Sequence, residues 1–368
     1  MSPQVDRTFT QSGCVRHPRS RRVTSTAPVT WKEVCHGPTA HSHRRHPLLP
    51  QWRRADLAAR VTYPSAFGPR REILLCDNGA NPGLADRVRD LGILPNDVTI
   101  RVIDATDHRG AAYARNRGIA EAQADLLAFC DDDDLVHPDW CRLAVDLLAD
   151  HPVVTGGVVV MDDIEMAKLD PAERRAVLEE RTIAAPVRPA GRGSLGPALM
   201  GGNFAARRGA LLAVRGFDAT LTLGGEDNDL AYRLDRAGVP VVDAGGMSII
   251  YARPSALRDR VRVRRLAGRA LVEATSAREA WTQAAELRRP PVAELARAGG
   301  ALAAMALGAK RRDWAGAADR AATAWGLTQG WVHRRLLGRR APSSVGLGLE
   351  QEAQASEGSN SSSGIARH

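Results

Sequence analysis

In Leu126-Leu-Ala-Phe-Cys-Asp-Asp-Asp-Asp-Leu-Val136, around which the chain is organised, an apolar run meets four consecutive carboxylates, Asp131 to Asp134. The apolar run predicts a buried strand, and the acids fall where that strand ends. In open α/β sheets, ligands bind at the carboxyl ends of the strands. Four adjacent carboxylates repel one another and lose hydration when buried, and a divalent cation such as Mg²⁺ or Mn²⁺ relieves both costs. The segment therefore predicts a metal site, and the alternative is a solvated acidic loop.

Strands and helices alternate on both sides of this segment. Apolar runs at Ile73–Cys76, Ile100–Ile103 and Val153–Met161 predict further buried strands. An alanine-rich stretch from Gly110 predicts one helix. Pro138 suits the start of another, whose apolar face repeats at helical spacing at Trp140, Leu143, Ala144, Leu147 and Leu148. Trp140 fits a core position better than a platform for a substrate. The alternation predicts a doubly wound, mostly parallel α/β sheet flanked by helices.

The net charge of +9 hides an uneven distribution along the chain. Residues 72–252 carry 18 basic and 29 acidic side chains, whereas residues 1–71 carry 13 and 3, and residues 253–340 carry 19 and 7. A nucleic-acid-binding protein typically presents a continuous basic face, which an acidic middle does not supply. We therefore expect no nucleic-acid partner, and the acidic middle suits a metal site.

Composition divides the chain into four parts. Residues 1–46 are basic, polar and without periodicity, which predicts disorder, and residues 341–368 form a Ser/Gly/Glu-rich tail of the same kind. Residues 47–265 hold the alternating strands and helices. Residues 266–340 are Arg-rich and helical, and we expect them to extend the main domain.

Cysteine usage and hydropathy favour a cytoplasmic protein. The five cysteines are odd in number and lack the spacing of a disulfide framework or a metal site. The N-terminus has no apolar run of the signal-peptide kind, and no apolar stretch approaches the length of a membrane span. Tryptophans of the C-terminal helices, among them Trp314 and Trp325, either pack these helices onto the main domain or contact the inner face of a membrane. We favour packing.

Two glycine-led motifs follow the acidic segment. Gly201-Gly202-Asn203 ends a Gly/Pro-rich loop, residues 184–203, that could move over a site. Gly224-Gly-Glu-Asp227 opens a predicted helix. Since the start of a helix favours negative charge, we expect Glu226 and Asp227 to be ionised at neutral pH.

Taken together, the motifs resemble those of the family 2 glycosyltransferases, which have the GT-A fold. That family shows a strand ending in Asp-(Asp/Asn)-Gly-Ser, an Ala-Arg-Asn-x-Gly helix, an aspartate-x-aspartate motif and a late Gly-x-Glu-Asp before a helix. The matching segments are Asp77-Asn-Gly-Ala80, Ala114-Arg-Asn-Arg-Gly118, Asp131-Asp-Asp133 and Gly224-Gly-Glu-Asp227. One such motif is weak, but four in the same order are strong. The resemblance runs from about Ala58 to Arg265.

The resemblance implies inverting transfer of a sugar from a nucleotide-diphosphate donor to a hydroxyl group. The acceptor would be a glycan, a lipid-linked or a small molecule, from the cell envelope or secondary metabolism. Carried over by position, Asp77 contacts the nucleotide base and Asp131 lies near the ribose. Arg115 and Asn116 match the pair near the nucleotide, although Arg115 could equally be a structural ion-pair partner.

The resemblance also assigns the metal and the base. Asp133 would hold Mn²⁺ or Mg²⁺ on the diphosphate, where a cation neutralises the charge of the leaving group. Asp227, with Glu226 beside it, matches the candidate general base, since a carboxylate can take the proton of the attacking hydroxyl. The alternative for Asp227 is a helix cap.

One departure from the family concerns its first strand. The expected place holds Val34-Cys-His-Gly-Pro-Thr-Ala-His-Ser-His43, which does not read as a strand. We therefore expect the first strand, and part of the nucleotide pocket, to be degenerate or missing. A misassigned start, a frameshift or a degraded gene copy would explain such a loss. This departure supports an alternative function, a catalytically inactive relative that binds nucleotide sugars.

Overall fold

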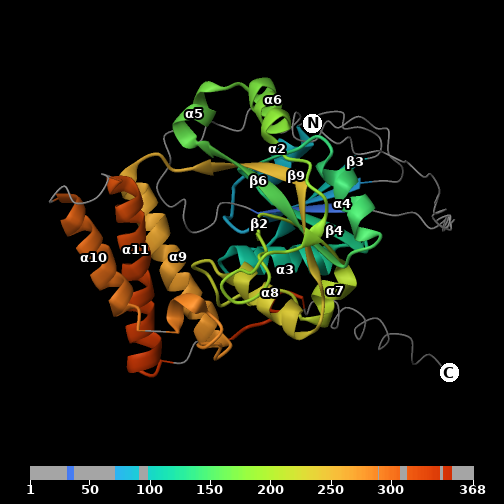
Figure 1. The fold of residues 1–368 in the computed structure, drawn as a ribbon. Helices are drawn as coiled ribbons and strands as arrows, with labels where there is room; N and C mark the ends of the chain where they lie inside the picture. The colour runs from blue at the N-terminus through green and yellow to red at the C-terminus, as the bar shows by residue number, and fades with distance from the viewer. Residues whose placement is uncertain are drawn as a thin grey trace, which may run out of the picture.

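A mixed sheet flanked by helices forms the main body, and a group of long helices lies at one side of it (Figure 1). The computed structural model describes residues 31–36, 71–90, 98–288, 290–306, 313–339 and 343–349 of the chain. Within those residues, the sheet has nine strands in the order β3-β2-β1-β4-β8-β6-β9-β5, with β7 paired to β9. The strands are β1 (Trp31–His36), β2 (Arg71–Asp77), β3 (Val98–Asp104), β4 (Leu126–Asp131), β5 (Leu135–Val136), β6 (Val153–Asp162), β7 (Arg188–Pro189), β8 (Asn203–Arg207) and β9 (Val241–Arg253).

The pairing confirms the predicted fold class. Strands β3, β2, β1 and β4 are parallel neighbours, and β6 and β9 are parallel as well. Strand β8 runs antiparallel between β4 and β6. The helices are α2 (Leu84–Arg89), α3 (Ala111–Glu121), α4 (Trp140–Leu148), α5 (Asp163–Lys168), α6 (Pro171–Arg181), α7 (Arg208–Ala213), α8 (Glu226–Arg236), α9 (Leu257–Ala277), α10 (Val292–Ala306) and α11 (Trp314–Trp331).

The expectation that the first strand is missing is wrong for the backbone. Strand β1 lies between β2 and β4 and pairs with both of them in parallel. It falls inside residues 1–46, for which we expected disorder, while the rest of that segment lies outside the described residues. Pattern reading missed β1 because its six residues, Trp-Lys-Glu-Val-Cys-His, include two adjacent charges and precede Gly-Pro. The backbone groups of β2 and β4 supply pairing partners on both sides, which local pattern does not reveal.

Alternate residues of β4 face two different core layers. Phe129 packs with Phe204 and Phe217 beneath α3 and α8, and the Phe129 and Phe204 rings stack at 4.3 Å between centroids. Cys130, on the other face, belongs to the layer covered by α4. Trp140 in that layer is fully buried, and its indole N–H donates to Asn203 Oδ1 at 2.7 Å. The tryptophan is therefore part of the core, as favoured above.

The C-terminal helices differ from the prediction in two respects. The predicted boundary after residue 265 falls inside α9, because that helix is continuous from Leu257 to Ala277. Helices α9 and α11 pack at close range, since a Cβ on Gly326 would lie 2.0 Å from the carbonyl oxygen of Arg265. Trp314 and Trp325 are each 45 % exposed, so neither side chain is buried against the main domain. None of the described helices has the length and apolarity needed to cross a membrane.

Candidate functional site

The site lies where the central parallel strands end. The register aligns His36 of β1 with Cys76 of β2 on one side and with Asp131 of β4 on the other. Asp77 comes one residue after Cys76, so it ends its strand next to the same edge. Because carboxyl ends of parallel strands meet at one edge, two acids that are far apart in the sequence flank β1.

Asp77 organises the loop that follows β2. Its carboxylate accepts hydrogen bonds from the backbone N–H of Gly79 at 3.0 Å, from the N–H of Asn81 at 2.8 Å and from the Asn81 side chain at 2.7 Å. The next residue, Asn78, bonds the N–H of Gly110 at 2.7 Å, at the start of α3. Ala80 has a φ of 50°, in the region that glycine prefers. The loop therefore has a defined shape, in which Asp77 is only partly buried.

A buried arginine joins the two acidic motifs. Arg115, on α3, donates from Nη2 to Asp131 Oδ1 at 3.1 Å and from Nη1 to Glu226 Oε1 at 2.6 Å. Its side chain is only 3 % exposed. Burial alone would lower the pKa of Arg115, but the negative charges of Asp131 and Glu226 raise it above its usual value. This arginine therefore stays charged and fixes β4 relative to the start of α8.

Two adjacent glycines let the chain pass close over these side chains. A Cβ on Gly202 would lie 2.6 Å from Asp131 Oδ2, and a Cβ on Gly201 would lie 3.1 Å from Arg115 Nη1. The backbone N–H of Gly201 also donates to Asp227 Oδ2 at 3.4 Å. Both glycines stand in a recognised motif, but their contact with Asp131 and Arg115 could not be read from the sequence.

Asp227 is more basic than its place at a helix start led us to expect. Burial and the neighbouring negative charge of Glu226 raise the pKa of Asp227 to about 6, although Arg115 and the backbone N–H of Asn228 oppose the shift. Glu226 forms an ion pair with Arg115, whereas Asp227 accepts its hydrogen bonds from neutral groups. The two acids therefore differ in their hydrogen-bond and ion-pair partners. Asp227 is the one suited to take up a proton near neutral pH.

The acidic turn after β4 presents its members unequally. Asp133 is exposed, Asp132 is partly buried, and Asp134 is buried with its N–H donating to the carbonyl of Asp131 at 3.3 Å. Asp132, which the motif makes the spacer, is thus less exposed than Asp133. Sequence reasoning missed Tyr251, whose pKa is raised by burial and then by the charges of Asp134 and Asp133. Nothing in the local pattern of β9 marks that tyrosine.

The donor set suits a cation shared with a substrate. Within the described ranges, no three His, Cys, Asp or Glu side chains gather as a complete metal cage. Magnesium-like ions are commonly held by one or two carboxylates together with substrate phosphates. An exposed carboxylate at Asp133, beside the strand ends, fits that arrangement.

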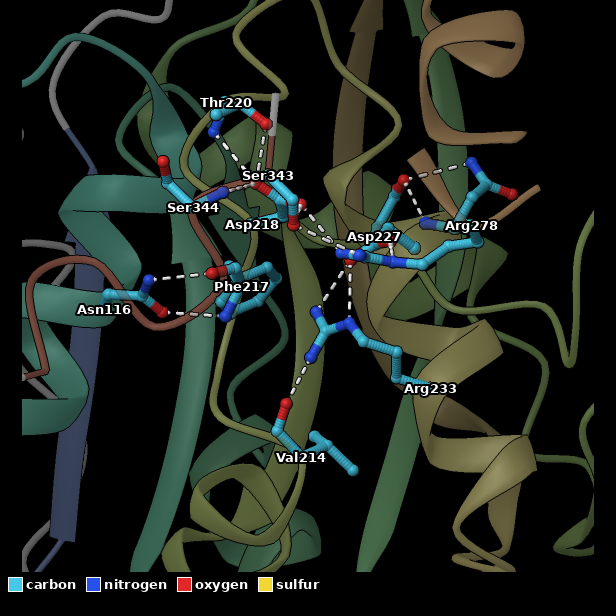
Figure 2. A network of polar contacts seen from close by, with 12 residues as sticks. Asn116, Val214, Phe217, Asp218, Thr220, Asp227, Arg233, Arg278, Ser343 and Ser344 are labelled. Carbon is cyan, nitrogen blue, oxygen red and sulfur yellow. Dashed lines mark hydrogen bonds and ion pairs between the residues drawn. The ribbon is translucent and has the colours of Figure 1, made fainter. Parts of the chain in front are cut away.

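Asn116, the other residue of the pair expected near the nucleotide, lies in the core. Asn116 is completely buried, and its side chain donates to the carbonyl of Phe217 at 2.9 Å and accepts from the N–H of Phe217 at 2.8 Å (Figure 2). The same side chain donates to the carbonyl of Leu347 at 2.9 Å. An amide occupied in this way holds α3 against the segment around Phe217. The sequence motif marks the residue but not the direction of its side chain.

A second polar network, which the sequence did not suggest, joins α8 to neighbouring segments of the chain. Asp218 and Asp229 are fully buried. Arg278 donates to Asp218 at 2.7 Å (Figure 2). Arg278 also donates to Asp229. Asp229 also accepts from Arg233 at 2.9 Å. Ser343 donates to Asp218 at 2.8 Å, so the C-terminal segment 343–349 is tied to the same cluster. Because Asp229 lies two residues after Asp227, the network fixes the helix that carries Asp227.

Comparison with known proteins agrees with this arrangement. Residues 57–214 match the family model "Glycosyl transferase family 2". Two curated relatives from Haloferax volcanii are similar over short stretches. A glucosyl-dolichyl phosphate glucuronosyltransferase is 37 % identical over 79 residues, which cover 21 % of this chain and 25 % of the relative. Glycosyltransferase AglE is 30 % identical over 88 residues, which cover 24 % and 27 %. The chain thus spans about a quarter of the length of each.

A solved structure extends the likeness to the fold. The mannosyltransferase PcManGT from Pyrobaculum calidifontis, in complex with GDP-Man and Mn²⁺, superposes with a TM-score of 0.52 at 20 % identity. The match covers 82 % of this chain and 87 % of that one. Together with the family match and the order of the site motifs, it confirms the resemblance stated above. Residues 57–214 are therefore similar to glycosyl transferase family 2, and the chain has the GT-A fold.

Proposed function

We propose that this protein is an inverting glycosyltransferase, which moves a sugar from a nucleotide-diphosphate donor to a hydroxyl group of an acceptor. The observation that carries the proposal is the buried contact of Arg115 with both Asp131 and Glu226. That contact brings the acidic strand end and the start of α8 together, so that a donor-binding acid and a proton-accepting acid border the same space.

Each residue of the site has a different role in the proposed reaction. Asp77 and Asp131 border the space where the nucleoside would lie, and Asp133 would hold a divalent cation together with the diphosphate oxygens. Such a cation, Mn²⁺ or Mg²⁺, neutralises the charge that grows on the departing diphosphate. Asp227 accepts the proton of the acceptor hydroxyl, for which its raised pKa is suited. Glu226 keeps Arg115 in place and, through its charge, raises the pKa of Asp227.

Strand β1 bears on the alternative of an inactive relative. That alternative depended on the loss of the first strand, and β1 fills the place between β2 and β4. The observation that favoured a catalytically silent protein is therefore gone, and we retain the enzyme.

For the acceptor we propose a glycan, a lipid-linked or a small molecule, met at the cytoplasmic face of a membrane. The support is the exposure of Trp314 and Trp325 on the helical extension, together with the Arg-rich first half of α9. Sedimentation with anionic vesicles tests the membrane contact. The Trp314→Ser/Trp325→Ser variant should bind such vesicles more weakly than the unaltered protein, and equal binding would count against it.

A donor screen tests the transferase activity itself. The protein is incubated with a panel of nucleotide sugars and Mn²⁺, and released nucleoside diphosphate is measured with and without candidate acceptors. We expect release with one donor, loss of release in EDTA, and its return when Mn²⁺ or Mg²⁺ is restored. Absence of binding and turnover with every donor would contradict the proposal.

A further inference from the structure

A cavity lined by arginines lies at the other end of α8 from Asp227. Its volume is about 790 Å³, and its wall includes Arg215, Arg233, Arg236 and Arg278 together with Ser343. Arg236 is the last residue of α8, so the helical rise places it about 14 Å along the axis from Asp227. The cavity is therefore separate from the space beside Asp131 and Asp133.

Two of the four arginines are held in position by buried carboxylates. Arg278 donates to the buried carboxylate of Asp218 (Figure 2). Arg278 and Arg233 both donate to the buried carboxylate of Asp229. The N–H groups of these two guanidinium groups are partly used by the carboxylates, which fix the direction of both side chains. Burial, and to a smaller extent the charge of Arg278, lower the pKa of Arg233 despite its bond to Asp229. An additional anion would therefore relieve repulsion at this wall.

The other two arginines add positive charge that no carboxylate in the described parts of the chain neutralises. Arg215 and Arg236 are exposed at the rim, and neither forms an ion pair with a residue in the described parts of the chain. Among the described residues, no Asp or Glu lines the cavity itself. Arg215 has a φ of 59°, in the region that glycine prefers, and lies two residues after the end of α7. The four guanidinium groups therefore carry more positive charge than the two buried carboxylates neutralise.

We propose that this cavity binds a phosphoryl group, carried either by a soluble phosphomonoester or by a phospholipid headgroup. The planar guanidinium group matches phosphate oxygens in bidentate geometry, and several of them can neutralise a doubly charged group. The hydroxyl group of Ser343, which lies in the wall, already donates to Asp218, so the guanidinium groups are the donors that an anion would use. The cavity is larger than a phosphate ion, so it has room for part of the molecule that carries the phosphate.

Titration calorimetry with inorganic phosphate tests the site in the full chain. EDTA is present throughout, so that no metal ion retains phosphate beside Asp133. The Arg215→Gln/Arg236→Gln variant removes two rim charges without touching the buried network. We expect it to bind phosphate at least about tenfold more weakly. The matched control, Arg181→Gln/Arg297→Gln, removes two exposed arginines from α6 and α10 and should bind as the unaltered protein does.

Two further titrations identify the source of the phosphoryl group. One uses glycerol phosphate, and the other uses vesicles of phosphatidic acid, with phosphatidylcholine vesicles as the reference. Binding of glycerol phosphate that depends on the rim arginines indicates a soluble ligand, and dependence seen only with phosphatidic acid indicates a lipid. If neither phosphate nor either carrier distinguishes the rim variant from the matched control, the proposal is wrong.

Discussion

Arg115 on α3 and Glu226 on α8 form a buried ion pair, with 2.6 Å between Nη1 and Oε1. The same guanidinium group reaches Asp131 at the end of β4. Three segments that are separate in the sequence are thereby held at fixed positions around one space. The family resemblance placed Arg115 near the nucleotide, whereas its contacts make it the residue on which the geometry of the acids depends.

The first prediction concerns the stability that Arg115 provides. Arg115→Met leaves two carboxylates without their partner, and Glu226 is buried, so we expect a loss of about 3–5 kcal/mol in the free energy of unfolding. Denaturant titration measures it. Replacement of Arg89, whose ion pair with Asp86 is exposed, is the control and should change stability by less than about 1 kcal/mol. An equally small effect of Arg115→Met would show that the acids do not need this partner.

A second prediction follows from the raised pKa of Asp227. Between about pH 4 and pH 6 the folded protein holds a proton that the unfolded chain has released, so this carboxylate lowers stability as the pH rises through that range. Asp227→Asn removes the cost. Thermal unfolding should show the variant on the order of 2 kcal/mol more stable at pH 7.5. Near pH 4 the two proteins should be nearly equal, and a variant that is no more stable at pH 7.5 would contradict the shift.

The third prediction tests the close passage of the chain over Asp131. In Gly202→Ala the new Cβ would lie 2.6 Å from Asp131 Oδ2, so either the loop or the carboxylate must move. We expect about tenfold or greater loss in kcat/KM for the donor, because small displacements of positioning groups are costly. Gly209→Ala is the matched control, since nothing lies within 4 Å of its Cβ and it is helical. Unchanged donor kinetics in Gly202→Ala would mean that Asp131 tolerates displacement.

A fourth prediction separates a structural role for Asn116 from a binding role. Asn116→Ala leaves the buried N–H of Phe217 and two carbonyl groups without this partner, which should cost about 2–3 kcal/mol of stability. The affinity for nucleoside diphosphate, measured by calorimetry well below the melting temperature, should stay within about twofold. A large loss of affinity at unchanged stability would restore the nucleotide contact that the motif implied.

The spacing of apolar residues correctly predicted those strands and helices whose formation depends on local sequence. The apolar run before Asp131 reads as a strand because five of its residues are apolar, and the spacing from Trp140 onward reads as a helix. Strand β1 could not be found in this way, since its place depends on the free edges of β2 and β4. The contact of Arg115 with Glu226 and the proton affinity of Asp227 also arise only when distant segments meet. The sequence therefore identified most of the acidic residues of the site, but not the differences in their partners and proton affinities.

The most direct test of the account is the pH dependence of sugar transfer in matched variants. With the donor found by the screen, kcat/KM is measured between pH 5 and pH 9 for the unaltered protein, Asp227→Asn and Asp86→Asn, the last a surface control on α2. We predict that activity rises with pH through about 6 in the unaltered protein and in Asp86→Asn. In Asp227→Asn we predict activity at least about 100-fold lower above pH 7, the usual contribution of a general base, and a smaller difference near pH 5, where Asp227 of the unaltered protein is mostly protonated. Full activity of Asp227→Asn, with the same pH profile, would contradict the central claim.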